Sequence, residues 1–199
     1  MTIKAVIFDI GGVFELTEPM DFDKRWESSL GLPPDTIWGP ATQHIWSAGR
    51  FGSMTEAEVR AALIDALGLP AVQVDGILET MWEQYLGSPN LQLIDYARAL
   101  RPTYRLGILS NSFSGARERE QALIDLVDDV VYSHEVGCAK PDPKIFAMSC
   151  ERLGVAPSDA VFIDDVPANV EAASAYGLHA ILFGTTAQVI ADVDRLLAD

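Results

Sequence analysis

The sequence has few cysteines and few basic residues. Only two of its 199 residues are cysteine, Cys138 and Cys150. Two thiols are too few for a disulfide-stabilised scaffold, and they fit a reducing compartment. Lysine and arginine number 14 against 29 aspartate and glutamate residues, which gives a formal net charge of −15. Because nucleic acid and anionic membrane surfaces both require a basic face, this balance argues against both as partners.

Long apolar segments are also missing. The first apolar run, residues 3–8, is shorter than the core of a signal peptide and ends at Asp9. No other segment approaches the length of a membrane span. With 49% hydrophobic and 22% charged residues, the composition is that of an ordinary globular protein. We therefore expect a cytoplasmic protein of one domain, or of one domain with a sizeable insertion.

Short apolar runs that end in polar or glycine-rich residues predict buried parallel strands. These runs are 4–8, 104–109, 129–132, 160–163 and 180–183. Apolar residues at helical spacing lie between the later runs, at 91–100, 116–127, 143–153 and 167–177. Strands that alternate with helices predict right-handed crossovers and an α/β fold with an open, doubly wound parallel sheet.

Residues 15–86 do not follow this alternation. No strand is predicted there, and the segment contains all four tryptophans and helical spacing at 55–67 and 72–86. Thr55, with Glu58 three residues later, has the pattern of a capping box before the first of these helices. We therefore predict a Rossmann-like core formed by residues 1–14 and 87–199, with a small, all-helical cap inserted at 15–86.

Polar residues follow the predicted strands at the edge of the sheet where ligands bind in this fold class. They are Asp9, Ser110, Asn111, Lys140, Asp164 and Asp165. Two carboxylates about 4 Å apart repel each other by roughly 4 kcal/mol at an effective dielectric constant of 20. Three carboxylates beside one lysine therefore call for a cation, and hard oxygen ligands next to a phosphate-sized pocket favour Mg²⁺.

Four short motifs resemble those of the haloacid dehalogenase superfamily and occur in the same order. They are VIFDIGGV at 6–13, LSN at 109–111, KPDP at 140–143 and FIDDVPAN at 162–169. The resemblance covers essentially the whole chain. It is greatest to phosphatases with a small helical cap after the first motif, such as sugar-phosphatase-like members and the N-terminal phosphatase domain of soluble epoxide hydrolases.

By position, this resemblance implies a catalytic aspartate and a metal site. Asp9 would be the nucleophile and would form an aspartyl-phosphate. Mg²⁺ would be held by Asp9, the backbone carbonyl of Gly11, and Asp165. Asp164 would complete the metal site by orienting a metal-bound water or Lys140.

The resemblance also implies how substrate binds. The expected substrate-binding residues are Ser110, Asn111, Lys140, Gly11 and Gly12. Ser110 and Lys140 would act in catalysis by holding the phosphate, and Lys140 would offset the charge of the nucleophile. The substrate would be a small phosphorylated metabolite selected by the cap, and the protein would act as a monomer or homodimer.

Gly11 departs from the family pattern. Phosphatases of this superfamily usually have a second aspartate at this position, two residues after the nucleophile, as general acid and base. A backbone carbonyl can bind metal whatever the side chain, but the proton donor is lost. General acid–base catalysis is typically worth a factor of about 10² to 10⁴. His44 in the cap is a possible substitute, although a histidine at such a place more often has no catalytic role.

Two alternative functions remain. A haloacid dehalogenase also lacks the second aspartate, but it works without metal and needs a positive site for a carboxylate. The Asp164–Asp165 pair produces the opposite field. A non-catalytic protein that binds a phosphometabolite or a protein partner is favoured by the loss of the acid. It is opposed by the retention of Asp9, Ser110 and Lys140.

Several polar and aromatic residues outside the motifs are interpreted as structural. Glu118, Arg119 and Glu120 are expected to form a solvated helix face. His134 and His179 are expected to be structural as well. The tryptophans are expected to form the core of the cap rather than a ligand site, with room for one or two of them to line the substrate entrance.

Overall fold

The computed structural model describes residues 2–198 and contains a five-stranded sheet with the order β5–β4–β1–β6–β7. All four strand pairs are parallel. The strands are β1 (Ala5–Phe8), β4 (Arg105–Ser110), β5 (Asp129–Tyr132), β6 (Ala160–Asp164) and β7 (His179–Leu182). The predicted doubly wound sheet is confirmed, and each strand begins and ends within one residue of its expected bounds.

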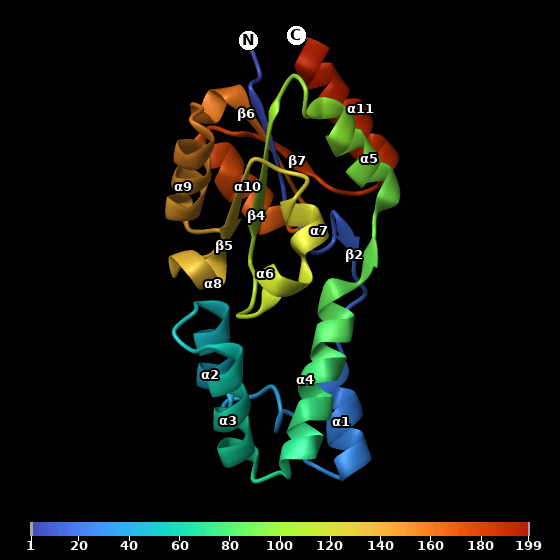
Figure 1. Cartoon of the computed structure of the whole chain (residues 1–199), viewed down its shortest axis with the longest axis vertical. Coiled ribbons are helices and arrows are strands. Elements are labelled where there is room, and N and C mark those ends of the chain that lie inside the picture. Colours follow the sequence, from blue (N-terminus) through green and yellow to red (C-terminus); the bar gives the residue numbers. More distant parts are fainter. Residues whose placement is uncertain (1, 199) are drawn as a thin grey trace.

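Helices cover both faces of this sheet (Figure 1). On one face lie α5 (Leu91–Leu100) and α11 (Thr186–Ala198), and on the other lie α9 (Pro143–Leu153) and α10 (Pro167–Tyr176). Because both faces are covered, every residue of β1 is buried. The helices predicted at 91–100, 143–153 and 167–177 are confirmed.

The single helix predicted at 116–127 is wrong. The segment forms two short helices, α6 (Ala116–Arg119) and α7 (Gln121–Ile124), which are separated at Glu120. The backbone of Glu120 leaves the helical region, with φ −103° and ψ 22°. Its side chain turns into the core, where it accepts a hydrogen bond from the Tyr132 hydroxyl. A further short helix, α8 (Ser133–Val136), follows β5 directly.

Four helices form a second lobe below the sheet (Figure 1). They are α1 (Phe22–Leu30), α2 (Gln43–Arg50), α3 (Glu56–Leu67) and α4 (Ala71–Leu86). The capping box of Thr55 and Glu58 is present at the start of α3. The lobe has its own apolar cluster, which contains Trp46 and Trp82. Trp38 does not belong to this buried core, because 47% of it is exposed.

A short antiparallel ribbon joins the two lobes. It pairs β2 (Glu15–Leu16) with β3 (Ser88–Pro89), so the helical lobe begins and ends at the same place on the core. The expectation that residues 15–86 contain no strand is therefore wrong at Glu15–Leu16. A two-residue strand is too short to show the alternation of polar and apolar residues that identifies strands in a sequence.

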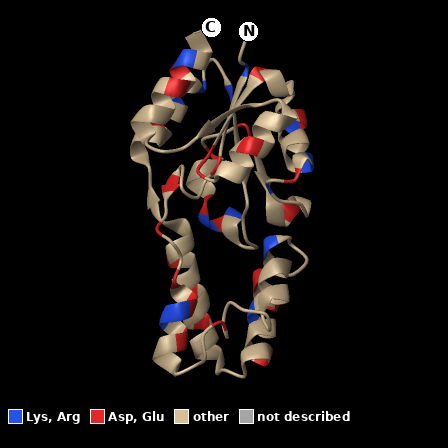
Figure 2. Cartoon of the chain, turned by 180° about the vertical axis from the view of Figure 1, so that it is seen from behind, with Lys and Arg blue, Asp and Glu red and all other residues tan. Residues whose placement is uncertain are grey.

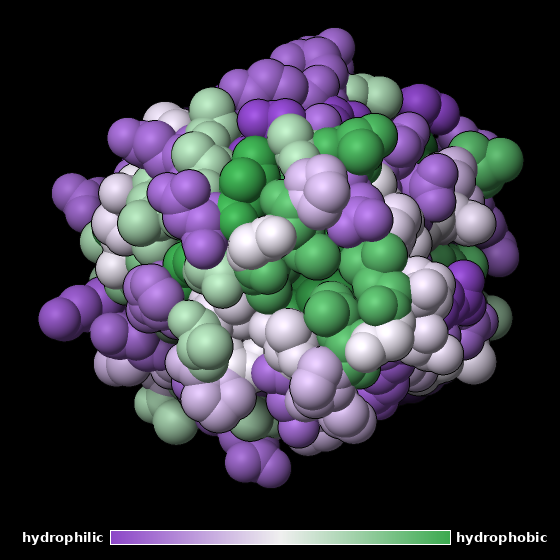
Figure 3. Space-filling view, turned by 90° about the horizontal axis from the view of Figure 1, so that it is seen from below, coloured by the Kyte–Doolittle hydropathy of each residue, from purple (hydrophilic) through white to green (hydrophobic). Residues whose placement is uncertain are grey.

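The surface reflects the acidic composition. Acidic side chains are spread over both lobes (Figure 2). The far end of the cap carries a hydrophobic patch (Figure 3), and Val72, in the first turn of α4, is 75% exposed. Within residues 2–198, no helix has the length and apolar character needed to cross a membrane.

Candidate active site

The register of the sheet aligns the polar ends of its central strands. Phe8 is paired with Ile108 on one side and with Ile163 on the other. The next residue of each strand therefore lies at the same edge, which places Asp9 beside Asp164. The backbone N–H of Asp9 continues this alignment by donating to the carbonyl of Ile163 at 2.9 Å.

Lys140 connects the strand ends through its ammonium group. Its Nζ lies 2.9 Å from Oδ1 of Asp9, 2.6 Å from Oδ2 of Asp164 and 2.9 Å from the carbonyl oxygen of Leu109. An ammonium group has three N–H donors, so these acceptors use all of them. The side chain of Lys140 is fully buried. Its charge is therefore held at a fixed point beside the Asp9 carboxylate.

Asp164 is held by protein donors alone. One of its oxygens accepts from the backbone N–H of Val166 at 2.8 Å, and both accept from Asn169 Nδ2 at 3.1 Å. With Lys140 as a further donor, most of its acceptor capacity is used. This geometry favours the expected role of Asp164 in orienting Lys140 over direct metal ligation.

Asn111 holds the backbone of the Lys140 loop. Its Nδ2 donates to the carbonyl of Lys140 at 2.9 Å, and its Oδ1 accepts from the N–H of Lys140 at 2.8 Å. The Asn111 side chain therefore positions Lys140, and its predicted contact with substrate stays a prediction. Ser110, the last residue of β4, is buried at the same rim.

Three carboxylates meet at this rim. Oxygens of Asp9, Asp164 and Asp165 all lie within 4.8 Å of one another. The pKa of Asp9 is raised to about 7, because burial and the Asp164 carboxylate together outweigh the lowering effect of the Lys140 ammonium. Burial, followed by the charge of Asp164, also raises the pKa of Asp165. One lysine does not neutralise this charge, so the site fits a divalent cation bound through Asp9 and Asp165.

The two glycines that follow Asp9 and Ile10 differ in what their surroundings allow. A Cβ added at Gly12 would lie 2.3 Å from Oδ2 of Asp165, and the φ of Gly12 is +76°. Only glycine fits there without displacing Asp165. At Gly11, a Cβ would meet no described atom within 4 Å, and φ is not in the left-handed range. The lost acid at Gly11 is therefore not a steric requirement of the fold.

A cavity of about 380 Å³ lies between the rim and the cap. Residues of the cap that line it are largely aromatic or apolar, and the core contributes Asn111, Ser112 and Phe113. The cap residues that line it are Met20, Trp38, Gln43, Trp46, Ser47, Arg50, Phe51, Met81 and Tyr85. Trp38 and Trp46 stack at 5.0 Å between ring centroids. The cavity has the size and apolar character typical of a small-molecule site.

The cap is attached to the core by direct contacts. Phe113 of the core packs within the apolar cluster of the cap. The backbone N–H of Ser114 donates to the carbonyl of Gly49 at 3.0 Å. Arg119 donates to Glu56 at 3.0 and 2.8 Å and lies 4.0 Å above the ring of Trp82. Arg119 is exposed, as expected for a solvated helix face, and it also forms this contact with the cap.

Sequence reasoning missed a group of buried polar residues behind the rim. Glu120 is only 2% exposed, so its expected place on a solvated helix face is wrong. Its Oε2 accepts from the Tyr132 hydroxyl at 2.5 Å. Glu15 lies near enough that the charge of Glu120 raises its pKa. The sequence does contain a signal for the burial of Glu120. This residue lies four residues after Ala116 and three before Leu123, on the apolar side of the helical pattern.

The histidines and Cys138 have no evident catalytic placement. His44 is exposed on α2 and is not among the residues that line the cavity between rim and cap, within the described part of the chain. His134 is paired with the hydroxyl of Ser112 at 2.6 Å. Burial raises the pKa of the Cys138 thiol, which disfavours the nucleophilic thiolate.

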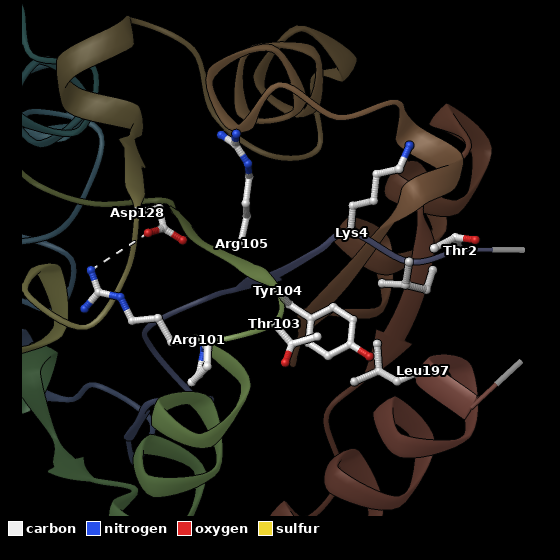
Figure 4. Close-up of a pocket in the computed structure, with 10 residues that line it drawn as sticks. Thr2, Lys4, Arg101, Thr103, Tyr104, Arg105, Asp128 and Leu197 are labelled. Atoms are coloured by element: carbon white, nitrogen blue, oxygen red, sulfur yellow. Dashed lines mark ion pairs between the residues drawn. The ribbon is translucent and has the colours of Figure 1, made fainter.

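A larger hollow of about 780 Å³ lies at the opposite ends of the strands (Figure 4). Its basic residues include Lys4 and Arg101. Lys4 is paired with Asp159 at 2.6 Å, and Arg101 faces Asp128 at 3.8 Å. Since parallel sheets bind ligands at the carboxyl ends of their strands, the rim at Asp9 is the better candidate site.

An open parallel sheet with aspartates and a lysine at one rim, under a helical lobe, defines a hydrolase of the type that the four motifs indicate. The family model described as haloacid dehalogenase-like hydrolase matches residues 3–177. The chain therefore belongs to the haloacid dehalogenase-like hydrolases, as the motifs predict.

Two curated relatives are phosphatases. The chain is 30% identical over 208 residues to a phosphatase of Mycobacterium tuberculosis, an alignment that covers 100% of this chain and 95% of the relative. It is 29% identical over 190 residues to the D-ribitol-5-phosphate phosphatase of Bacteroides thetaiotaomicron, covering 89% of this chain and 90% of the relative.

Solved structures share the fold. A predicted hydrolase of this family from Porphyromonas gingivalis has a TM-score of 0.79 and 27% identity, and each chain is covered completely. A Bacteroides thetaiotaomicron enzyme in complex with magnesium and phosphate has a TM-score of 0.75, 22% identity and coverages of 92% and 96%. A 2-haloacid dehalogenase of Pseudomonas syringae has a TM-score of 0.72, 20% identity and coverages of 99% and 99%. The last two likenesses concern the fold alone.

Proposed function

We propose that this protein is a Mg²⁺-dependent phosphatase of small phosphorylated metabolites. The observation that carries the proposal is the arrangement of one lysine and three aspartates at the rim. Lys140 contacts Asp9 and Asp164, while Asp9, Asp164 and Asp165 have oxygens within 4.8 Å of one another. Such a rim suits an anionic phosphate only when a cation joins it. The two phosphatase relatives support the same reading.

Asp9 acts as the nucleophile. Its carboxylate attacks the phosphorus, and the leaving oxygen departs from the opposite side to give an aspartyl-phosphate. Lys140 holds positive charge 2.9 Å from the attacking group, which stabilises the ionised form of Asp9. Ser110 holds an oxygen of the phosphoryl group, and Lys140, whose three donors are already used, stabilises the phosphoryl oxygens by its charge. Water then hydrolyses the aspartyl-phosphate and restores Asp9.

Asp9, the backbone carbonyl of Gly11 and Asp165 would hold the metal ion. Bound there, Mg²⁺ would supply positive charge for the phosphoryl oxygens and relieve the repulsion among the carboxylates. A solved structure of similar fold contains magnesium and phosphate together, which is consistent with this assignment.

The cavity beneath the cap would receive the leaving group. Its volume of about 380 Å³ suits a metabolite rather than a macromolecule. Its lining offers Gln43, Ser47 and Arg50 for polar contacts and aromatic rings for packing. Action in the cytoplasm, as a monomer or homodimer, remains part of the proposal on grounds of composition alone.

Dehalogenation is the second candidate, because a 2-haloacid dehalogenase shares the fold. That reaction needs a positive site for the carboxylate of its substrate. Here Asp164 and Asp165 place negative charge at the rim instead.

A panel of phosphorylated metabolites, assayed with and without Mg²⁺ beside a chloroacetate control, separates the two functions. We expect Mg²⁺-dependent phosphate release and no halide release. Halide release that persists in excess chelator would establish the dehalogenase instead. Binding of phosphometabolites without turnover of any panel member would support a non-catalytic role.

A further inference from the structure

Tyr85 extends from the cap toward the reaction site. It lies at the end of α4, where its ring packs edge-to-face on Trp82 at 5.1 Å between centroids. It lines the cavity together with Asn111 and Ser112. Burial raises the pKa of its hydroxyl, and the nearby Ser110 side chain opposes that rise. A phenol of the cap is therefore held between the leaving-group cavity and the phosphate rim.

The carboxyl group of Glu120 lies behind this phenol. Its Oε2 accepts from Tyr132 at 2.5 Å, while Oε1 is buried and has no hydrogen-bond partner among the described residues. A buried oxygen without a partner is costly, and a protonated carboxyl group could instead donate from it. Burial and the charge of Asp9 raise the pKa of Glu120 to about 7, while the hydroxyls of Tyr132 and Tyr85 oppose that rise.

The chain lacks the acid that its family usually has beside the nucleophile. Gly11 offers no side chain, and the space above it is open to at least 4 Å among the described atoms. The leaving oxygen must therefore receive its proton from another group or depart as an anion. Among the groups that the cavity presents near Ser110, the Tyr85 hydroxyl carries an exchangeable proton and does not already hold Lys140 in place.

We propose that Tyr85 donates the proton to the leaving group, in place of the acid absent at Gly11. The inference rests on the proposed phosphatase function. As Asp9 forms its bond to phosphorus, the bond from phosphorus to the leaving oxygen breaks, and that oxygen takes the proton of Tyr85. The water that later attacks the aspartyl-phosphate returns a proton to the Tyr85 phenolate.

The surroundings of Tyr85 suit a proton donor. Burial, together with the carboxylates of Glu120, Asp9 and Glu15, raises the pKa of its hydroxyl well above the ordinary value. The hydroxyl therefore stays protonated before reaction. It is a weaker acid than a carboxyl group, so it helps most where the leaving oxygen is strongly basic, as in alkyl phosphates.

The test compares an alkyl phosphate, glycerol 2-phosphate, with an aryl phosphate, 4-nitrophenyl phosphate. Tyr85→Phe keeps the ring but removes the proton. We expect the ratio of kcat for the alkyl substrate to kcat for the aryl substrate to fall by about 10². Tyr96→Phe is the matched control, because the Tyr96 hydroxyl bonds Asp194 on the surface of the core and should leave the ratio unchanged.

A rescue experiment separates proton donation from cap packing. Gly11→Asp places an acid in the open space beside the nucleophile, so adding it to Tyr85→Phe should restore the ratio.

Each outcome has one meaning. Turnover of 4-nitrophenyl phosphate by the wild type tests the proposed function alone. If that turnover is present and Tyr85→Phe slows both substrates equally, or leaves both unchanged, the assignment of Tyr85 is wrong while the phosphatase function stands. If the wild type turns over no phosphate ester, both proposals fail together.

Discussion

A Cβ at Gly12 would lie 2.3 Å from the carboxylate of Asp165. Gly12→Ala should therefore move Asp165 and weaken Mg²⁺ binding, and the positive φ should cost about 1–2 kcal/mol of stability in addition. Gly11→Ala is the matched control, because its Cβ meets nothing within 4 Å among the described atoms, and we expect little change. Thermal unfolding with and without Mg²⁺ measures both effects. Equal behaviour of the two variants would contradict the crowding at Gly12.

Asp9 is the residue on which turnover should depend most. Asp9→Asn removes the nucleophile but leaves Lys140 bound to Asp164 and to the Leu109 carbonyl. We expect kcat to fall by a factor on the order of 10⁴ or more while the fold stays intact. Rapid-quench mass spectrometry of the wild type should find the phosphoryl group on Asp9. An active asparagine variant would exclude this nucleophile.

Asp165 should control the response to metal. Mg²⁺ that binds only the folded state raises stability by about 2.7 kcal/mol at a hundred times its Kd. Asp165→Ala should remove most of that rise in melting temperature, because one ligand is lost and the remaining carboxylates bind weakly. Asp95→Ala, at an exposed carboxylate paired with Arg98, is the control that should keep it. Chelation should stop hydrolysis, and persistent turnover in excess chelator would argue against a metal enzyme.

The missing acid at Gly11 should appear in the choice of leaving group. Charge builds on the leaving oxygen in a loose phosphoryl transition state. Tyr85 is a weaker donor than a carboxylic acid, so aryl, acyl and anomeric sugar phosphates should react faster than alkyl phosphates. A plot of log kcat/KM against leaving-group pKa should be steep. Gly11→Asp should speed the reaction of alkyl phosphates by up to roughly 10² and so make the slope shallower. A flat plot for the wild type would mean that a strong acid is already present.

Stability should fall as pH rises through the pKa values of the buried carboxyls. Burial raises the pKa of Glu120 from 4.5 to about 7, so between these values the folded state holds a proton that the unfolded state has lost. The free energy of unfolding then decreases with rising pH, by about 3 kcal/mol for this group.

Glu120→Gln tests this linkage, because it keeps the acceptor for Tyr132 but cannot ionise. In metal-free urea denaturation, its stability relative to wild type should increase from pH 4.5 to pH 8. The variant should retain part of the pH dependence through Glu15, whose pKa burial raises to about 8. A constant difference between variant and wild type would show that Glu120 is charged throughout.

Much of the core and its rim follows from local patterns in the sequence. Buried parallel strands are read as continuous apolar runs, and helices 143–153 and 167–177 are marked by proline at the first turn and glycine after the end. Once the strands are parallel, their carboxyl ends must share an edge. Strand register then brings Asp9 beside Asp164, and Asn111 just after β4 holds the loop from which Lys140 reaches both.

What only the tertiary structure decided depends on contacts between residues far apart in the chain. The place of Glu120 is set by Tyr132, and that of Arg119 by Glu56. Local sequence spacing does not predict either partner, because both lie far away in the chain. Without such a distant partner, a charged residue on a short helix would be solvated. The approach of Tyr85 to the rim likewise depends on how the cap docks on the core. The sequence by itself therefore determined the strands and the rim of polar residues at their ends, whereas the docking of the cap decided which groups line the cavity beside that rim.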